Sequence, residues 1–205
     1  MSTLVTLPTG VNGIEWTPPR RSAFVTQSAY SAKQTILDRG TITEGWRAAV
    51  SVAATADPRP WRAWQAAMQG PVNYTDVQAV YAPQVASGTN PTIGAVTSVT
   101  QVTLAGLPFS QTDYLPAGSL MTIYTGASST KPRLVTLTQA VSSDGSGNGV
   151  AHFQPPIGGL TTALVCVVRL PFCRMRLTPP YELGYTEAMP GIYTPVAVNL
   201  TELVE

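Results

Sequence analysis

The stretch Asp57–Gly70, DPRPWRAWQAAMQG, decides the fold because it is a helix-like segment in a chain that otherwise alternates like strands. Asp57 has the side chain of an N-cap, and Pro58 suits the first helical position. Gly70 and the proline after it end the segment. We predict a helix over 58–69, whose one apolar stripe is formed at spacings of three and four by Trp61, Trp64 and Met68.

Two tryptophans on one short helix could also form a sugar platform or a cation cage. A structural role is favoured, because the stripe is the one surface by which this helix can dock on other elements. The run before it, residues 41–54, alternates as a strand and places Trp46 on the same face as Val50. Glu44 interrupts that apolar row. We therefore predict a mainly β protein in which a helix closes one end of a β-sandwich, with core residues Trp46, Trp61, Trp64 and Met68.

The composition shifts between residues 90 and 160, where short strands with almost no charge follow one another without tryptophan. Strands at this spacing favour a small β-barrel. Residues 161–178 then return to one long apolar strand, and a last strand is expected over 193–200. The predicted plan is a discontinuous sandwich core, residues 1–85 and 162–205, with an inserted small barrel over 90–160.

The chain has 205 residues, a net charge of +1 and only 11% charged residues. Typical soluble domains carry roughly 25%. So few charges favour a surface covered by partners, with a secreted β protein of neutral surface as the alternative. The weak net charge gives no general attraction to nucleic acid. No signal peptide or membrane-spanning run is evident at the N-terminus or elsewhere.

Cys166 and Cys173 lie seven residues apart on the predicted long strand. Such a segment spans roughly 23 Å, whereas a disulfide needs Cα atoms within about 7 Å. We expect two free thiols, unless Pro171 turns the chain sharply. Free thiols fit synthesis in a reducing cytoplasm.

Catalytic chemistry has no recognisable motif in this sequence. The single histidine, His152, lies in an alternating strand and has no identifiable partner for acid–base or metal chemistry. The loop Ser142–Gly149 lacks the lysine of a phosphate loop and the spaced acids of a calcium loop. We interpret it as a turn that uses glycine's positive φ. We expect no enzyme activity, no cofactor and no metal.

Several motifs together resemble a family of minor tail proteins of long non-contractile-tailed bacteriophages. The core part reads Arg39-Gly40, then Trp46-Arg47-Ala48, then Pro60–Ala66 (PWRAWQA). The inserted part reads Leu115–Ser119 (LPAGS), Ser143–Asn148 (SDGSGN) and Pro155-Pro156. Ser119 stands where relatives have an acidic residue. The resemblance covers roughly residues 39–177.

This resemblance implies a distal tail protein with a core akin to the tail-tube subunit. Such a protein forms a ring, usually a hexamer, at the distal end of the virion's tail, after synthesis and assembly in the host cytoplasm. Its partners are the tail tube protein, the hub and the tape-measure protein, while DNA passes only transiently through the lumen. Another tube-end minor tail protein built on the same sandwich is an alternative.

Residues for these contacts can be suggested from their positions in the strands. We expect Arg169, Arg174 and Arg176 to contact a neighbouring subunit, and charge reversal at Arg174 to weaken assembly without unfolding the monomer. A second hypothesis is a carbohydrate-binding adhesion module that contacts host-surface glycan through Tyr114 and Tyr124. A cell-wall hydrolase would need a paired acid and base or a zinc site, and neither is visible.

Overall fold

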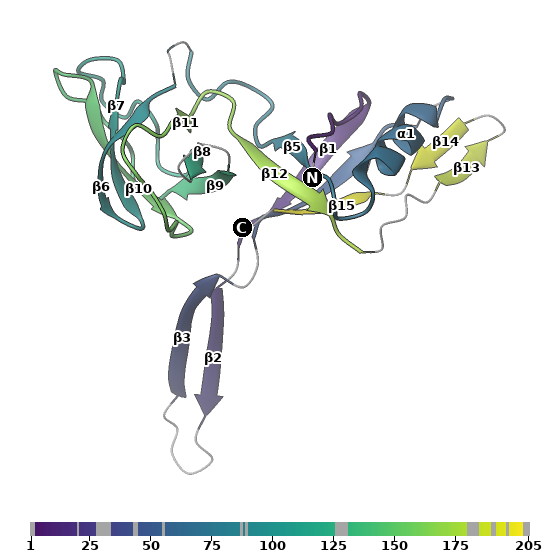
Figure 1. The fold of residues 1–205 in the computed structure, drawn as a ribbon, viewed down its shortest axis with the longest axis horizontal. Coiled ribbons are helices and arrows are strands. Elements are labelled where there is room, and N and C mark those ends of the chain that lie inside the picture. The colour runs from purple at the N-terminus through teal and green to yellow at the C-terminus, as the bar shows by residue number, and fades with distance from the viewer. Residues whose placement is uncertain are drawn as a thin grey trace.

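The computed structural model describes residues 3–19, 21–27, 34–42, 45–54, 56–86, 88, 90–125, 131–179, 185–189, 192–195 and 197–202. Within these residues the chain forms two large antiparallel sheets, two separate hairpins and one helix (Figure 1). The predicted class, mainly β with one short helix and an inserted barrel-like module, is confirmed.

The core sheet has five strands in the order β1-β4-β15-β12-β5, all antiparallel. Its strands come from both ends of the chain, so the core is discontinuous in sequence. The central strand, β15, comes from the C-terminal part of the chain and pairs with β4 from the N-terminal part. Their bounds are β1 Val11–Thr17, β4 Arg47–Val52, β5 Thr75–Gln78, β12 Phe172–Leu177 and β15 Val198–Glu202.

One face of the core sheet is buried because apolar side chains alternate along its strands. On β4, Ala48, Val50 and Val52 are buried, whereas Arg47 and Ser51 are exposed. The helix α1, Arg59–Met68, packs onto this face through its apolar stripe. Its bounds lie within one residue of the prediction.

The start of α1 differs in detail from the expected cap. Pro58, not Asp57, takes the N-cap position, and no side chain caps the helix there. The Asp57 carboxylate instead accepts the backbone N–H of Arg59 at 3.0 Å and pairs with the Arg59 guanidinium at 2.7 Å. Helix α1 ends at Met68, and its C-cap, Gln69, is left-handed with φ of 50°.

The second large sheet, here called the barrel sheet, curls until its two edges meet. Its order is β11-β8-β9-β10-β7-β6. Edge residue Thr92 bridges to Val165, and the Ile93 N–H donates to the Leu164 carbonyl at 2.9 Å. A separate apolar cluster fills its interior. The strands are β6 Thr92–Ser98, β7 Gln101–Ala105, β8 Leu120–Thr125, β9 Lys131–Leu137, β10 Asn148–Gln154 and β11 Cys166–Val167.

The predicted strand over 161–178 is two short strands in different sheets. Cys166 and Val167 pair with β8 in the barrel sheet, whereas β12 joins the core sheet. Leu164, Cys166 and Val168 are buried in the barrel cluster. The insert therefore extends to about residue 170, and the boundary predicted at residue 160 is wrong, because alternation along a strand does not specify which sheet it joins.

The predicted strand over 193–200 is likewise divided. Its first part lies in β14, Ile192–Pro195, which pairs with β13, Tyr185–Met189. Its second part starts β15 and fills the centre of the core sheet between β4 and β12. The strand predicted over 41–54 is also divided: residues 41 and 42 end β3 (Gln34–Ile42), and β4 begins at Arg47. Glu44 lies outside the described residues.

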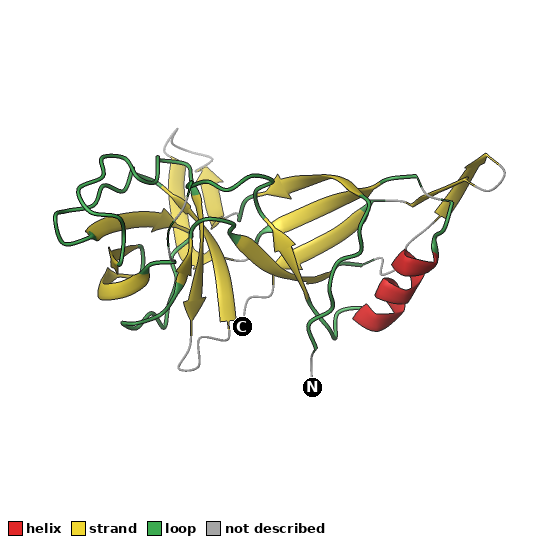
Figure 2. Cartoon of the chain, turned by 90° about the horizontal axis from the view of Figure 1, so that it is seen from above, coloured by secondary structure: helices red, strands yellow, loops and turns green. Residues whose placement is uncertain are grey.

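A two-stranded hairpin projects from the core sheet away from the rest of the molecule (Figure 1). It consists of β2, Arg21–Gln27, and β3, Gln34–Ile42, paired antiparallel to each other. The β13–β14 hairpin extends at the end of the molecule opposite the barrel sheet, beyond α1 (Figure 2). The body thus has a barrel at one end and small projecting hairpins elsewhere.

Candidate functional site

The two modules meet where β12 lies against β8 and β9. Four polar side chains lie along this contact and bridge the core sheet, the barrel sheet and the connector before the barrel. We call them the junction residues: Gln84, Thr122, Arg133 and Glu202. Thr122 and the Arg133–Glu202 pair form hydrogen bonds between the two sheets, and Gln84 bonds the connector to the barrel sheet.

Gln84 belongs to the connector that leads into the barrel. Its amide nitrogen donates to the carbonyls of Leu120 at 2.7 Å and Val168 at 2.8 Å, and its amide oxygen accepts the Leu120 N–H at 2.8 Å. One side chain therefore satisfies backbone groups at the start of β8 and after β11. Thr122 joins the two sheets in a similar way. Its hydroxyl, on β8, donates to the carbonyl of Phe172 on β12 and accepts the Phe172 N–H.

Glu202 places a fully buried carboxylate at the centre of the junction. It accepts the backbone N–H of Trp46 at 3.1 Å and of Leu134 at 3.3 Å, and it pairs with the Arg133 guanidinium at 3.1 Å. The Trp46 indole N–H donates to the Leu134 carbonyl at 2.8 Å beside it. A buried carboxylate is tolerated only when its oxygens are satisfied in this way.

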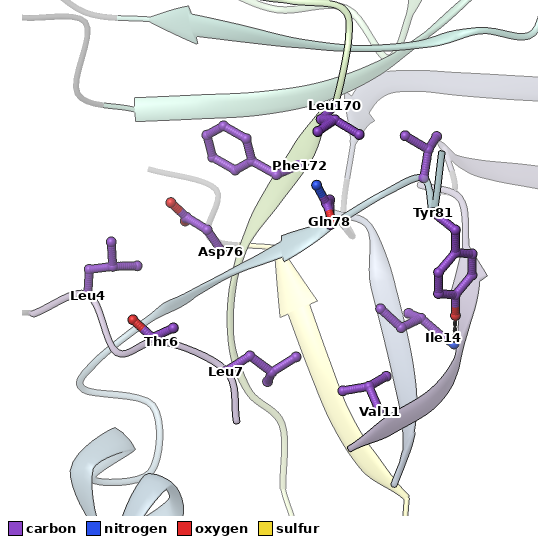
Figure 3. A pocket seen from close by; sticks show the side chains of 11 residues that line it. Leu4, Thr6, Leu7, Val11, Ile14, Asp76, Gln78, Tyr81, Leu170 and Phe172 are labelled. Carbon is purple, nitrogen blue, oxygen red and sulfur yellow. Dashed lines mark hydrogen bonds between the residues drawn. The ribbon is translucent and has the colours of Figure 1, made fainter. Parts of the chain in front are cut away.

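A cleft of about 470 Å³ opens between the N-terminal segment, β1 and β5, and Phe172 of β12 also lines it (Figure 3). We call it the edge cleft. Its lining is mainly apolar, with a few polar groups, a composition typical of ligand and peptide pockets. The residues that define its walls are Leu4, Leu7, Ile14, Asp76, Gln78 and Phe172.

The one carboxylate of the edge cleft is already paired. Asp76 and Arg174 form a two-point ion pair at 2.8 and 3.0 Å, and the guanidinium lies 4.4 Å from the centre of the Tyr74 ring. The hydrogen bond to Asp76 raises the pKa of Arg174. Tyr124 of the barrel sheet packs edge-on against Phe172, and partial burial, followed by the charge of Asp76, raises the pKa of Tyr124.

All four residues assigned to the core from the sequence are buried in the core cluster. Their exposed fractions are 5% or less. Trp46 packs edge-on against Trp16, and Trp61 against Trp64. The two helical tryptophans are thus covered, so they present no open sugar platform.

The three arginines suggested for a subunit interface have different surroundings. Arg169 is exposed at the junction, and Arg176 lies partly buried on β12. Arg174 is held by Asp76 within its own chain, so charge reversal there is expected to disturb the monomer. This ion pair does not agree with the expectation that such a variant leaves the fold intact, while the interface role of the three arginines stays a prediction.

Tyr114 and Tyr124 are in different surroundings. Tyr114 packs against the barrel cluster, and partial burial raises its pKa. Tyr124 lies beside Phe172 and Asp76 at the junction. Of the two, Tyr124 has the aromatic and charged neighbours that a glycan site requires.

The cysteines and the glycine-rich loop have structural surroundings. Cys166 and Cys173 are free and buried, and burial raises both thiol pKa values, that of Cys166 to about 12. In the loop, the Asp144 carboxylate accepts the N–H groups of Ser146 and Asn148, each at 2.8 Å. These bonds lower the pKa of Asp144. The loop is a hydrogen-bonded turn that leads into β10.

The junction residues were not identified from the sequence. Glu202 had a detectable signal, because it continues the inward period-two row of Val198 and Leu200. Gln84 had none, since it lies in an irregular connector. Among the described residues, no group of three or more histidine, cysteine or acidic side chains could hold a metal ion. In that same part of the chain, no helix has the length and apolarity needed to cross a membrane.

No protein-family model matches the chain, and no curated protein matches its sequence.

Proposed function

We propose that this chain is a structural component of a phage tail tip: a ring-forming distal tail protein that joins the tail tube to the baseplate hub and performs no catalysis. The ring is expected to be a hexamer that contacts the tube, hub and tape-measure proteins. DNA passes only through its lumen. The proposal places the protein in the virion, at the distal end of the tail.

The observation that carries the proposal is a core sheet assembled from both ends of the chain around an inserted barrel, with a hairpin projecting from it (Figure 1). A projecting hairpin has open outer strand edges that a neighbouring chain can pair with. The low charge of the whole sequence also suits a surface that neighbours cover. Repeated head-to-tail contacts of this kind close into a ring when the rotation allows.

Carbohydrate binding is the second candidate, favoured by one observation. Tyr124 lies beside Phe172 and the Asp76–Arg174 pair, which combines aromatic faces with planar polar groups at the module junction. Adsorption to host-surface polysaccharide by Tyr124→Ala, compared with Tyr114→Ala and wild type, tests this candidate. Specific loss in Tyr124→Ala would support an adhesion role.

Labelling of phage particles tests the tail-tip proposal directly. An antibody against the purified chain, with a gold label, is applied to particles of the phage whose genome encodes it. We expect label confined to the distal end of the tail. Label along the whole tube, on the capsid or absent from the particle would contradict the proposal.

A further inference from the structure

We propose that the edge cleft binds an extended, uncharged peptide segment of a partner protein. The segment pairs as an added strand with the free edge of β5 and places an apolar side chain in the cleft. This mode of recognition combines main-chain hydrogen bonds with a side-chain pocket. The inference concerns one surface of the core sheet and does not rest on the tail-tip proposal.

The outer edge of β5 is open beyond Tyr74. The N–H and C=O of Tyr74 bond to Thr3 and Val5 of the N-terminal segment, and the Ala79 N–H bonds to the Pro171 carbonyl before β12. Backbone groups alternate in direction along a strand. Those of Asp76 and Gln78 therefore point away from β12. Among the described residues, no backbone group pairs with them on that side.

The N-terminal segment leaves this edge after Val5, and the edge cleft opens in the space between them (Figure 3). Leu7 and Phe172 lie on its walls. On the opposite edge strand, β1, the N–H of Ile14, which lines the cleft, already donates to the Tyr81 hydroxyl at 2.8 Å. At this point of the cleft the added strand therefore pairs with the outward groups of Asp76 and Gln78 on β5.

The backbone groups at the rim favour a peptide over a lipid. An acyl chain in the cleft would cover the outward N–H and C=O groups of Asp76 and Gln78 without satisfying them, which is unfavourable. An added strand satisfies them. A charged side chain would lose its water without gaining a partner, because Asp76 is already paired with Arg174 at 2.8 Å. The fitting segment is therefore uncharged where it enters the cleft.

A displayed library of random nine-residue peptides, selected on the full-length protein, provides the first test. We expect enriched peptides to alternate apolar and polar residues and to lack charge at the central apolar position. N-methylation of the peptide backbone at its pairing face is expected to weaken binding by at least about tenfold, because it removes main-chain hydrogen bonds. No enrichment, enrichment of charged peptides, or binding insensitive to N-methylation would overturn the proposal.

A matched pair of variants locates the binding site. Gln78→Pro removes the outward N–H, and an edge-strand proline is tolerated when its N–H would face away from the ladder. Gln78→Ala removes the same side chain and keeps the N–H. We expect selected peptides to bind Gln78→Pro about three- to tenfold more weakly than wild type, and Gln78→Ala within about twofold. Equal binding by both variants would contradict pairing at β5.

Other occupants give different results in the same experiments. Decanoate serves as a probe for an apolar small molecule. If it competes with the peptides and binds Gln78→Pro as tightly as wild type, the occupant of the cleft is an apolar small molecule and not a peptide. Self-association that Gln78→Pro abolishes, without any enriched peptide, would identify a second copy of the chain. Either result overturns the proposal, while the gold-labelling result for the tail tip stands or fails by itself.

Discussion

At the scale of single residues, Glu202 is the side chain on which the attachment of the barrel most depends. It occupies an inward position on β15, where its neighbours at alternate positions are Val198 and Leu200. A carboxylate there is explained by its three donors, which come from Trp46, Arg133 and Leu134. The first belongs to the core and the other two to the barrel sheet, so one residue joins both modules.

Removing this carboxylate should destabilise the whole protein. We expect Glu202→Ala to lower the free energy of unfolding by about 2–4 kcal/mol, since it leaves two buried N–H groups and Arg133 without their acceptor. Glu202→Gln should have a smaller effect, about 1–3 kcal/mol, because it keeps one accepting oxygen. Urea unfolding measures both. The exposed control Asp113→Asn should stay within about 0.5 kcal/mol of wild type, and equal stability of Glu202→Ala would show that the carboxylate does not hold the junction.

The buried thiol of Cys166 makes stability depend on pH in the alkaline range. Its pKa is raised by burial to about 12, from an ordinary value of 9.0. Above pH 9 the unfolded chain loses this proton while the folded chain keeps it, so the unfolded state binds fewer protons and stability falls as pH rises.

Cys166→Ala removes this contribution alone, because Cys173 is present in both proteins. Between pH 9 and the pKa of the folded thiol, wild type should therefore lose stability relative to Cys166→Ala by roughly 1.4 kcal/mol for each pH unit of increase. Urea unfolding under reducing conditions at pH 7, 9, 10 and 11 gives this difference. A difference that is constant over the whole range would contradict the assigned burial.

At the scale of elements, the entry into β10 depends on two glycines, Gly147 in the turn and Gly149 in the strand itself. Gly147 has φ of +76°, and a Cβ there would lie 2.5 Å from the Leu107 carbonyl oxygen. A Cβ on Gly149 would lie 2.6 Å from the Ser142 carbonyl oxygen. Backbone atoms cannot yield as a flexible side chain can, so both positions require glycine.

Gly147→Ala should lower the free energy of unfolding by about 1–3 kcal/mol, through strain at positive φ and the contact with Leu107. Gly158→Ala is the matched control, because a Cβ there meets nothing within 4 Å and φ is not in the left-handed region. Thermal and urea unfolding compare the two. Equal losses in both variants would mean that the turn does not require glycine.

Local patterns predicted elements well and sheet membership poorly. The apolar stripe of α1 and the alternation of β4 follow from periods of 3.6 and 2, which a short sequence carries. The runs 161–178 and 193–200 are each divided between two sheets, since alternation gives a face but not a partner strand. The pairing of Arg174 with Asp76, 98 residues apart, and the connector role of Gln84 depend on tertiary structure that no local pattern encodes.

At the scale of the whole molecule, the arrangement is a barrel held firmly on a core sheet by the junction residues, with hairpins projecting from the body (Figures 1 and 2). The hydrogen bonds and the ion pair between the two sheets favour one orientation of the barrel relative to the core sheet. Each subunit of a ring would then place its barrel at an equivalent position. In the proposed ring, the monomer is one repeating part of a closed assembly.

The mass of the purified full-length chain in solution, from light scattering with negative-stain images of the same peak, tests this account most directly. We predict closed rings with a central hole and a mass of about six times 21.7 kDa. A particle of one chain's mass at every concentration, with no rings in the images, would contradict the claim that the protein is a ring-forming part of a tail.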